Sequence, residues 1–237
     1  MYISMNLAFY TYFYGSNNNQ AFRVPDIPSS TYPCYYYTNN TSIMENLKNT
    51  KWIGMYEDII TNDDLIESCM VGKRVKTMPH EYTELQGYDY LCFLDSKLEK
   101  VDESFVERFI RTYFFEQNYA LLLREHVFIR ENIWMEYYIS MEQDRYQMES
   151  EKYMKYILHM IDNHGLRATT EHHCQCGFLI RNMRHEKIQE INTTWYEHIQ
   201  QCGIQDQISF FFVKQYFEEY ILPFTEVPFV SEEVPFA

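Results

Sequence analysis

One segment constrains the fold more than any other. Residues 88–95 read Tyr-Asp-Tyr-Leu-Cys-Phe-Leu-Asp, a nearly continuous apolar run that ends in a carboxylate. A strand that is apolar on both faces belongs in the middle of a sheet that helices cover on both sides. Along the chain, further strand-like segments alternate with segments whose apolar residues have helical spacing. The sequence therefore predicts an α/β fold with a mostly parallel central sheet flanked by helices.

The remaining elements follow from periodicity and turn residues. The segments predicted as strands are residues 7–14, 33–38, 52–55, 119–123 and 177–181. The predicted helices cover residues 103–117, 142–161, 186–200 and 206–220, with a short helix at residues 63–67 before Gly72. At 237 residues the chain can bury a conventional core, so we expect one domain over residues 1–222. Residues 223–237 contain the sequence Glu-Val-Pro-Phe twice and are predicted to be a non-helical tail.

Charge and cysteine usage exclude several classes of function. The formal net charge of −14 repels nucleic acid and anionic membranes, so we expect no nucleic-acid partner. The six cysteines are scattered along the chain, which favours a reducing compartment over a disulfide framework. The chain shows no basic leader and no apolar run near the ~20 residues that span a bilayer. We therefore expect neither a signal peptide nor a membrane-spanning segment.

Asp95 is the first candidate for chemistry, because ligands in open α/β sheets bind beyond the carboxyl ends of the strands. A carboxylate at that place can hold a divalent metal against a diphosphate. Arg74, Lys76 and Lys97 are predicted near the same end of the sheet, where cations would stabilise an anionic leaving group. The alternatives are that Asp95 starts a turn and that these cations form a solvated face.

A second group of candidates follows the predicted strand at residues 119–123. His126, Arg130 and Glu136 leave the same edge of the sheet and are predicted to share its cleft, although an isolated Glu is more often a surface ion-pair partner. Residues 171–176 contain two His and two Cys, but consecutive residues of a strand point to opposite faces and chelate zinc poorly. Asp206 precedes an amphipathic run and has an alternative role as a helix N-cap.

Several of these segments resemble a known family. Their order along the chain is Lys76-x-x-Pro79-His80, residues 88–98, Arg124 with His126-x-x-x-Arg130 and Glu136, residues 177–181, and residues 205–210. This order is similar to that of a family long catalogued as a domain of unknown function and now treated as glycosyltransferases. Its members occur in plant Golgi mucilage-related proteins and in bacterial and viral polysaccharide genes. The resemblance covers residues 7–217.

The resemblance implies a GT-A-like fold and a glycosyltransferase that moves a sugar from a nucleotide-sugar donor to a hydroxyl of a glycan acceptor. A UDP-sugar is the favoured donor. A divalent metal, Mn²⁺ or Mg²⁺, would be held by Asp95 and His185. Asp95-Ser96-Lys97 stands where such enzymes have an Asp-x-Asp motif, and Lys97 would replace part of the metal's charge.

The resemblance also assigns the remaining site residues. If the reaction inverts the anomeric centre, Asp206 or Glu136 would take the acceptor proton, whereas in a retaining reaction neither acts as a classical base. The residues expected to bind the nucleotide sugar are Tyr12, Tyr14, Thr38, Asn39, Arg74, Lys76, Lys97, His126 and Arg130. Two departures leave the nucleotide open, because Asn39 stands where relatives often have Asp and Gln205 replaces the Arg before Asp206.

Two rival functions remain at this stage. One is a non-catalytic module of the same fold that binds a glycan or a nucleotide, and the other is a metal-dependent hydrolase built on residues 172–176. The expected location is the cytoplasm, either free or peripheral to a membrane site of glycan assembly. Low Gly with abundant Asn, Tyr, Ile and Met indicates an AT-rich bacterial or viral genome.

Overall fold

The computed structural model describes residues 5–16, 24–95, 100–126, 128–129 and 131–229. Its strands are β1 (Leu7–Phe13), β2 (Cys34–Thr38), β3 (Ile53–Tyr56), β4 (Tyr90–Leu94), β5 (Leu121–Glu125), β6 (Cys174–Asn182) and β7 (Ile221–Phe224). They form one sheet in the order β3-β2-β1-β4-β6-β5-β7. All strands run in the same direction except β6, which is antiparallel to both of its neighbours. The predicted α/β fold with a mostly parallel sheet is confirmed.

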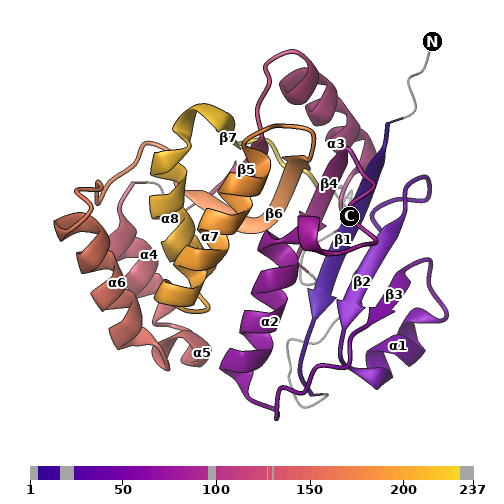
Figure 1. The fold of residues 1–237 in the computed structure, drawn as a ribbon, viewed down its shortest axis with the longest axis horizontal. Helices are drawn as coiled ribbons and strands as arrows, with labels where there is room; N and C mark the ends of the chain where they lie inside the picture. The colour runs from indigo at the N-terminus through magenta and orange to yellow at the C-terminus, as the bar shows by residue number, and fades with distance from the viewer. Residues whose placement is uncertain (1–4, 17–23, 96–99, 127, 130, 230–237) are drawn as a thin grey trace, which may run out of the picture.

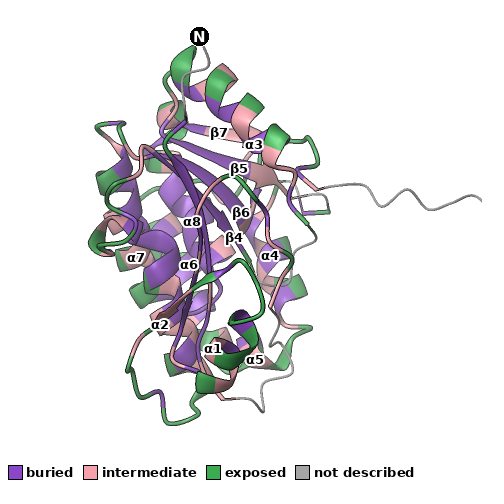
Figure 2. Cartoon of the chain, turned by 90° about the vertical axis from the view of Figure 1, so that its right-hand side faces the viewer, coloured by how far each residue is buried: buried purple, intermediate pink, exposed green. Residues whose placement is uncertain are grey.

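Helices cover both faces of the sheet (Figure 1). They are α1 (Thr41–Leu47), α2 (Leu65–Thr77), α3 (Glu103–Phe109), α4 (Ile133–Ser140), α5 (Asp144–Gln147), α6 (Ser150–Asp162), α7 (Ile188–Cys202) and α8 (Asp206–Tyr216). One face packs against α2, α7 and α8, and the other against α1 and α3. A third apolar cluster joins α4, α5 and α6 to α8. Figure 2 shows the sheet almost wholly buried between these layers, which explains the continuous apolar strands.

The reversed strand β6 brings two distant segments to one edge of the sheet. In its register with β4, Leu94 lies opposite Phe178 and Tyr90 lies opposite Asn182. The start of β6 therefore lies beside the carboxyl end of β4, where the Asp95 N–H donates to the Gly177 carbonyl at 2.8 Å. At this edge, which we call the carboxyl edge of the sheet, the carboxyl ends of β1, β4 and β5 meet the amino end of β6. The loop after β6 lies at the opposite edge.

Helix α2 differs from the prediction, because it continues through Gly72 instead of ending before it. A Cβ atom at Gly72 would lie 2.0 Å from Cε2 of Tyr12 on β1. The glycine is therefore a point of close approach between α2 and β1, and not a helix stop. This contact fixes the position of the Tyr12 ring near the end of β1.

The region between β5 and β6 also differs from the prediction. Where one helix was expected over residues 142–161, the chain forms α5 and α6, and α4 precedes them as an element that the sequence did not predict. The predicted helix at residues 103–117 is α3, continued by a π-helical turn at Ile110–Phe115. Strand β6 begins at Cys174, earlier than expected.

Strand β7 crosses the domain boundary that we predicted between residues 222 and 223. Pro223 lies within this edge strand, a position that tolerates the missing N–H. Phe224 is buried against Phe105, Phe109 and Phe178. The domain therefore includes residues up to at least Phe224. Within the described ranges, no helix combines the length and the apolar character needed to cross a membrane.

Candidate active site

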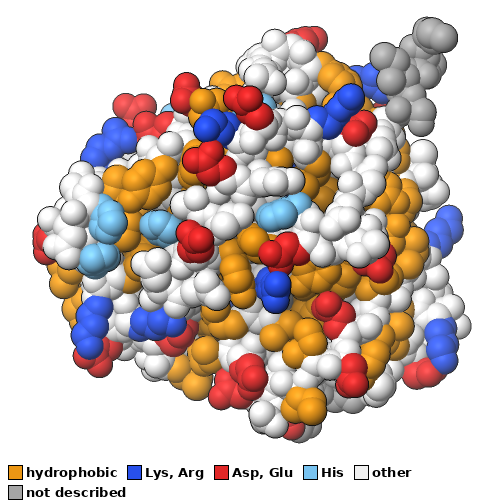
Figure 3. Space-filling model, viewed as in Figure 1, with side chains coloured by type: hydrophobic (Ala, Val, Ile, Leu, Met, Phe, Trp, Pro, Cys, Tyr) orange, Lys and Arg blue, Asp and Glu red, His pale blue; other side chains and the backbone are white. Residues whose placement is uncertain are grey.

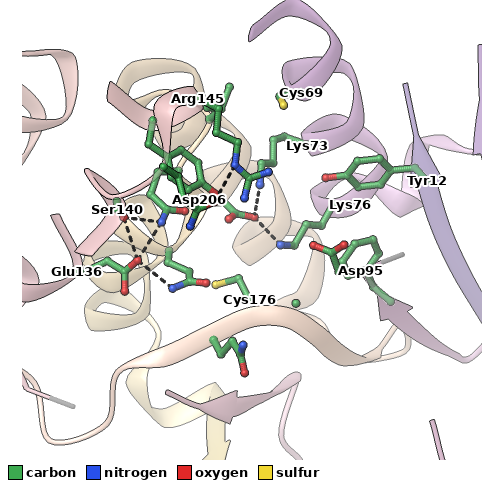
Figure 4. A pocket seen from close by; sticks show the side chains of 18 of the residues that line it. Tyr12, Cys69, Lys73, Lys76, Asp95, Glu136, Ser140, Arg145, Cys176 and Asp206 are labelled. Carbon is green, nitrogen blue, oxygen red and sulfur yellow. Dashed lines mark hydrogen bonds and ion pairs between the residues drawn. The ribbon is translucent and has the colours of Figure 1, made fainter. Parts of the chain in front are cut away.

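A pocket of about 400 Å³ lies at the carboxyl edge of the sheet. Its floor comes from the ends of β1 and β4 and the start of β6, and its sides come from α2, α4, α5 and the segment that leads into α8 (Figure 4). Parallel strands place their carboxyl ends, and the side chains that follow them, at such an edge. On the face shown in Figure 3, the described Lys and Arg side chains are scattered among acidic ones rather than gathered into a patch.

The centre of the pocket holds two lysines and one carboxylate, which we call the lysine cluster: Lys73, Lys76 and Asp206. Lys73 Nζ lies 3.0 Å from Asp206 Oδ2, and Lys76 Nζ donates to the same oxygen. The three side chains are only 12%, 5% and 6% exposed. Burial by itself raises the pKa of Asp206, but the two ammonium groups hold it at about 2. Burial lowers the pKa of Lys76, and the Asp206 carboxylate acts in the opposite direction by stabilising the ammonium form. With both lysines protonated, the cluster carries a surplus of one buried positive charge.

Helical spacing explains why Lys73 and Lys76 meet while Arg74 does not join them. Residues three apart on a helix share a face, and the adjacent residue is turned away by about 100°. Arg74 instead pairs with Glu81, with Nη2 2.8 Å from Oε2, and lines a separate groove on the outer side of α2. Of the predicted cations, the structure thus brings Lys76 into the pocket and places Arg74 outside it. Lys97 and Arg130 lie outside the described residues.

Glu136 of α4 is buried and accepts four hydrogen bonds. The donors are His173 Nε2 at 2.8 Å, Gln205 Nε2 at 2.9 Å, Gln207 Nε2 at 3.0 Å and Ser140 Oγ at 3.3 Å. Both carboxylate oxygens are occupied, so Glu136 organises the surrounding side chains. It is not the exposed ion-pair partner that spacing alone would suggest.

His126 lies next to this group, with its ring stacked on that of His173 at a centroid distance of 5.8 Å. Its Nδ1 accepts from the backbone N–H groups of Phe128, at 3.2 Å, and Ile129, at 2.9 Å. Burial is the main cause that lowers the pKa of His126 below its usual value. The imidazole is therefore neutral near pH 7, with its proton on Nε2.

The segment before α8 is held by a carboxylate outside the pocket. Glu149 Oε2 accepts from the backbone N–H of Ile204 at 2.7 Å. Gly203 has a φ of 115°, and a Cβ atom there would lie 2.5 Å from the same oxygen. This contact positions the residues that follow, Gln205 and Asp206. Gln205 occupies the N-cap position of α8, and its side chain makes no capping hydrogen bond to the helix. The alternative role of Asp206 as the N-cap is therefore not observed.

Tyrosines and Asp95 form the other end of the pocket. The Tyr12 ring stacks on Phe93 at 5.7 Å, and the Tyr14 hydroxyl donates to Glu57. Asp95 is exposed and follows β4, as predicted from the sequence, and Figure 4 shows it at the Tyr12 side of the lysine cluster.

Two residues predicted to bind the donor, Thr38 and Asn39, make structural contacts outside the pocket. Thr38 is buried, and its Oγ1 accepts from the Asn40 N–H at 3.0 Å. Asn39 links two loops, because its Oδ1 accepts from the Gly15 N–H at 3.0 Å and its Nδ2 donates to the Ile59 carbonyl at 2.8 Å. Asn39 lines a separate shallow groove, and neither residue lines the pocket.

His185 lies at the opposite edge of the sheet from Asp95. It follows β6, and the antiparallel direction of that strand carries it away from the pocket. Its Nδ1 accepts from the Lys187 N–H at 3.1 Å, and its ring packs against Tyr220. A metal site shared by Asp95 and His185 is therefore not formed. Within the described part of the chain, no three His, Cys, Asp or Glu side chains are grouped so that they could hold a metal.

Several pocket residues were missed by the sequence analysis. They are Cys69, Lys73, Gln143, Arg145, Tyr146, Gln175 and Gln207. The helical spacing of Cys69, Lys73 and Lys76 was a usable signal, because these positions share one face of α2. Arg145 and Tyr146 had none, since the single helix predicted over residues 142–161 did not show the break between α5 and α6 or which face of α5 meets the pocket. Residues 173–176 do reach the site, where His173 holds Glu136 and the residues around Cys176 form the floor.

Comparison with known proteins identifies the fold. No family model matches the sequence, and no curated protein matches it as a relative. Mouse xyloside xylosyltransferase 1 is 9% identical over 94% of this chain and 84% of its own, with a TM-score of 0.50. The bifunctional glycosyltransferase WbbM is 9% identical over 94% of this chain and 39% of its own, with a TM-score of 0.51. Core-mannan synthase A from Aspergillus fumigatus, in an Mn/GDP form, is 13% identical over 93% and 73%, with a TM-score of 0.48. The likeness to the first two of these glycosyltransferase structures shows that the chain has a GT-A-like fold.

Proposed function

We propose that this protein transfers a sugar from a nucleotide-sugar donor, with a UDP-sugar as the favoured donor, to a hydroxyl of a glycan acceptor. The observation that carries the proposal is the lysine cluster. A surplus positive charge lies inside a pocket, at the ligand-binding edge of the sheet, in a chain whose net charge is −14. Such a buried cation pair suits the diphosphate of a nucleotide sugar.

The layout of the pocket suggests how a donor would lie. Figure 4 shows Tyr12 and Asp95 at one end, the lysine cluster in the middle, and Glu136 with Ser140 at the other end. In the proposed arrangement the nucleotide lies toward Tyr12 and Tyr14, where an aromatic ring can stack on a base. The diphosphate contacts Lys73 and Lys76, and the transferred sugar lies toward Glu136.

In the proposed reaction, the acceptor hydroxyl oxygen forms a bond to the anomeric carbon while the bond from that carbon to the diphosphate oxygen breaks, and the hydroxyl proton passes to the leaving diphosphate oxygen. Negative charge develops on the leaving diphosphate. Lys73 and Lys76 stabilise this charge, and they are already oriented before the reaction because Asp206 holds both ammonium groups. Asp206 is then a positioning residue for the two lysines.

This assignment changes the roles that the sequence analysis gave to the two candidate bases. A carboxyl group whose pKa is about 2 and that is paired to two lysines is a weak proton acceptor, which argues against Asp206 as the base. Glu136 already accepts four hydrogen bonds. We therefore propose that Glu136 positions Gln205 and Gln207 rather than removing the acceptor proton.

A divalent metal, Mn²⁺ or Mg²⁺, fits one part of the pocket. Mg²⁺ is commonly held by one or two carboxylates together with substrate phosphates, and Asp95 supplies one carboxylate beside the proposed diphosphate position. When bound, the metal would neutralise charge on the diphosphate. His185 takes no part in this proposal.

Thermal unfolding against UDP-, GDP- and CMP-sugars, with and without Mn²⁺, tests the proposed donor class. A ligand at ~100 times its dissociation constant stabilises the folded state by about 2.7 kcal/mol, so one nucleotide class should raise the melting temperature. Lys73→Met should abolish the rise, because it removes a cation of the lysine cluster. Arg74→Met is the matched control on the other side of α2 and should keep it.

The metal is tested in the same assay with two variants at the ends of β4. Asp95→Asn should remove the part of the stabilisation that depends on Mn²⁺. The control is Asp89→Asn at the residue before β4, where Asp89 pairs with Arg184 at 3.5 Å. This variant should keep the stabilisation that depends on Mn²⁺. No stabilisation by any of the nucleotides at millimolar concentration would contradict the proposal. Stabilisation without sugar transfer or donor hydrolysis would favour a non-catalytic binding module.

A further inference from the structure

The pocket contains two regions of different charge. Among the described lining residues, the Lys and Arg side chains are Lys73, Lys76 and Arg145. Arg145 lies over the Tyr146 ring at 4.4 Å, and the Lys73 ammonium lies close enough to Tyr146 to affect the pKa of its hydroxyl. The other region, which we call the Glu136 wall, consists of His126, Glu136, Ser140, Gln205 and Gln207. The only carboxylate of this wall is Glu136.

The charge of Glu136 is not offset by a cation within its wall. Gln205, Gln207 and Ser140 are neutral donors, and His126 is neutral near pH 7. His173 donates its Nε2–H to Glu136 at 2.8 Å, and its Nδ1 is buried with no hydrogen-bond partner in the described part of the chain, so no acceptor there could receive a second N–H. The Glu136 wall therefore carries a net negative charge.

The same wall offers neutral groups to sugar hydroxyls. The fixed tautomer of His126 leaves an Nε2–H donor on a ring that lines the pocket. Gln207 uses one amide N–H for Glu136, and its amide still has a second N–H and a carbonyl oxygen. Hydroxyl groups can both donate to and accept from such side chains, whereas a carboxylate at this wall would face a like charge.

We infer that the transferred sugar is neutral, and that the Glu136 wall discriminates against donors whose sugar carries a carboxylate. This inference rests on the proposed function, because it requires the diphosphate to contact the lysine cluster and the sugar to lie toward Glu136. It names a substrate class, neutral hexoses or pentoses as opposed to uronic acids.

Calorimetric titration of the full chain with UDP-glucose and UDP-glucuronic acid tests the inference, with UDP alone as the reference. The two donors differ only in the group at C6, a hydroxymethyl in one and a carboxylate in the other. We expect UDP-glucuronic acid to bind roughly tenfold or more weakly than UDP-glucose. Equal or tighter binding of the uronate would overturn the inference. If guanine nucleotides bind instead, GDP-mannose and GDP-mannuronic acid form the matched pair.

Two variants of Gln207 link the discrimination to the wall. Gln207→Lys adds a positive charge beside Glu136 and should reduce or reverse the penalty against the uronate. Gln207→Met has similar length without charge and should retain the penalty. An unchanged ratio of the two affinities in Gln207→Lys would show that the sugar does not lie at this wall. Failure of UDP and GDP to bind at all is a different result, and it would contradict the proposed function itself.

Discussion

At the lysine cluster, two buried ammonium groups share one carboxylate oxygen of Asp206. Removing a partner from a buried group of charges leaves an uncompensated charge, which costs more than the loss of a surface ion pair. Asp206 therefore contributes to stability as well as to the orientation of Lys73 and Lys76. Its low pKa makes this contribution measurable through its pH dependence.

We predict that Asp206 stabilises the fold by about 2 kcal/mol near neutral pH, and that this contribution disappears in acid. The pKa of Asp206 is about 2 in the folded chain and 3.8 ordinarily, so the unfolded chain binds the proton more readily. The stabilisation is complete above about pH 4 and is lost as the pH falls toward about 2. Urea unfolding of the wild type and Asp206→Asn across this range measures it.

The expected result is a stability difference between the two proteins that shrinks as the pH falls. Asp162→Asn, which changes an exposed carboxylate of α6, serves as the control and should show no such dependence. A difference that stays constant from neutral pH into this acid range would show that Asp206 does not titrate as an ion-paired group.

At the scale of elements, the contact between α2 and β1 sets the position of the site. Gly72 allows the Tyr12 ring to lie against the helix, and the next turn of the same helix carries Lys73 and Lys76 into the pocket. The ring also stacks on Phe93 of β4. One glycine thus couples the aromatic end of the pocket to the lysine cluster.

We predict that Gly72→Ala destabilises the fold by roughly 1–3 kcal/mol, because the added Cβ would lie 2.0 Å from a ring atom of Tyr12. The same change should weaken nucleotide binding, since either the ring or the helix must move. Denaturant unfolding and the nucleotide-dependent melting shift measure the two effects. Gly87→Ala is the control, because a Cβ there meets no atom within 4 Å. Equal stability of the Gly72→Ala and Gly87→Ala variants would contradict the close contact between α2 and the Tyr12 ring.

On the scale of the whole molecule, the C-terminal strand closes the core. β7 pairs with β5 at the edge of the sheet, and Phe224 packs against aromatic side chains of α3 and β6. The core on this face therefore depends on a segment that the sequence analysis assigned to a tail.

We predict that Phe224→Ala destabilises the protein by about 3–5 kcal/mol, the usual cost of removing a buried aromatic side chain. Val227→Ala alters a residue of the same segment that is 58% exposed and should change stability by less than about 0.5 kcal/mol. Urea denaturation of the wild type and the two variants measures both changes in the free energy of unfolding. Similar stabilities would place the end of the domain before Phe224.

The sequence alone was sufficient for the fold class and for part of the pocket. Apolar runs report which segments are buried on both faces, and that information was enough to locate β1, β2 and β4 and to place Asp95 at a strand end. Of the residues predicted for the site, Tyr12, Tyr14, Lys76, Asp95, His126, Glu136 and Asp206 all line one pocket. Their roles in binding and catalysis stay predictions.

Tertiary structure decided the rest. An apolar run does not encode the direction of a strand, so only the pairing of β6 with β4 and β5 shows that His173 reaches the site and His185 does not. Local sequence cannot distinguish a glycine that ends a helix from one that admits a neighbouring ring, as Gly72 does. Helical spacing groups Lys73 with Lys76 and turns Arg74 away from them, but only the packing of α2 determines which of these two faces lies in the pocket. In each case the missing information is a contact between residues far apart in the chain.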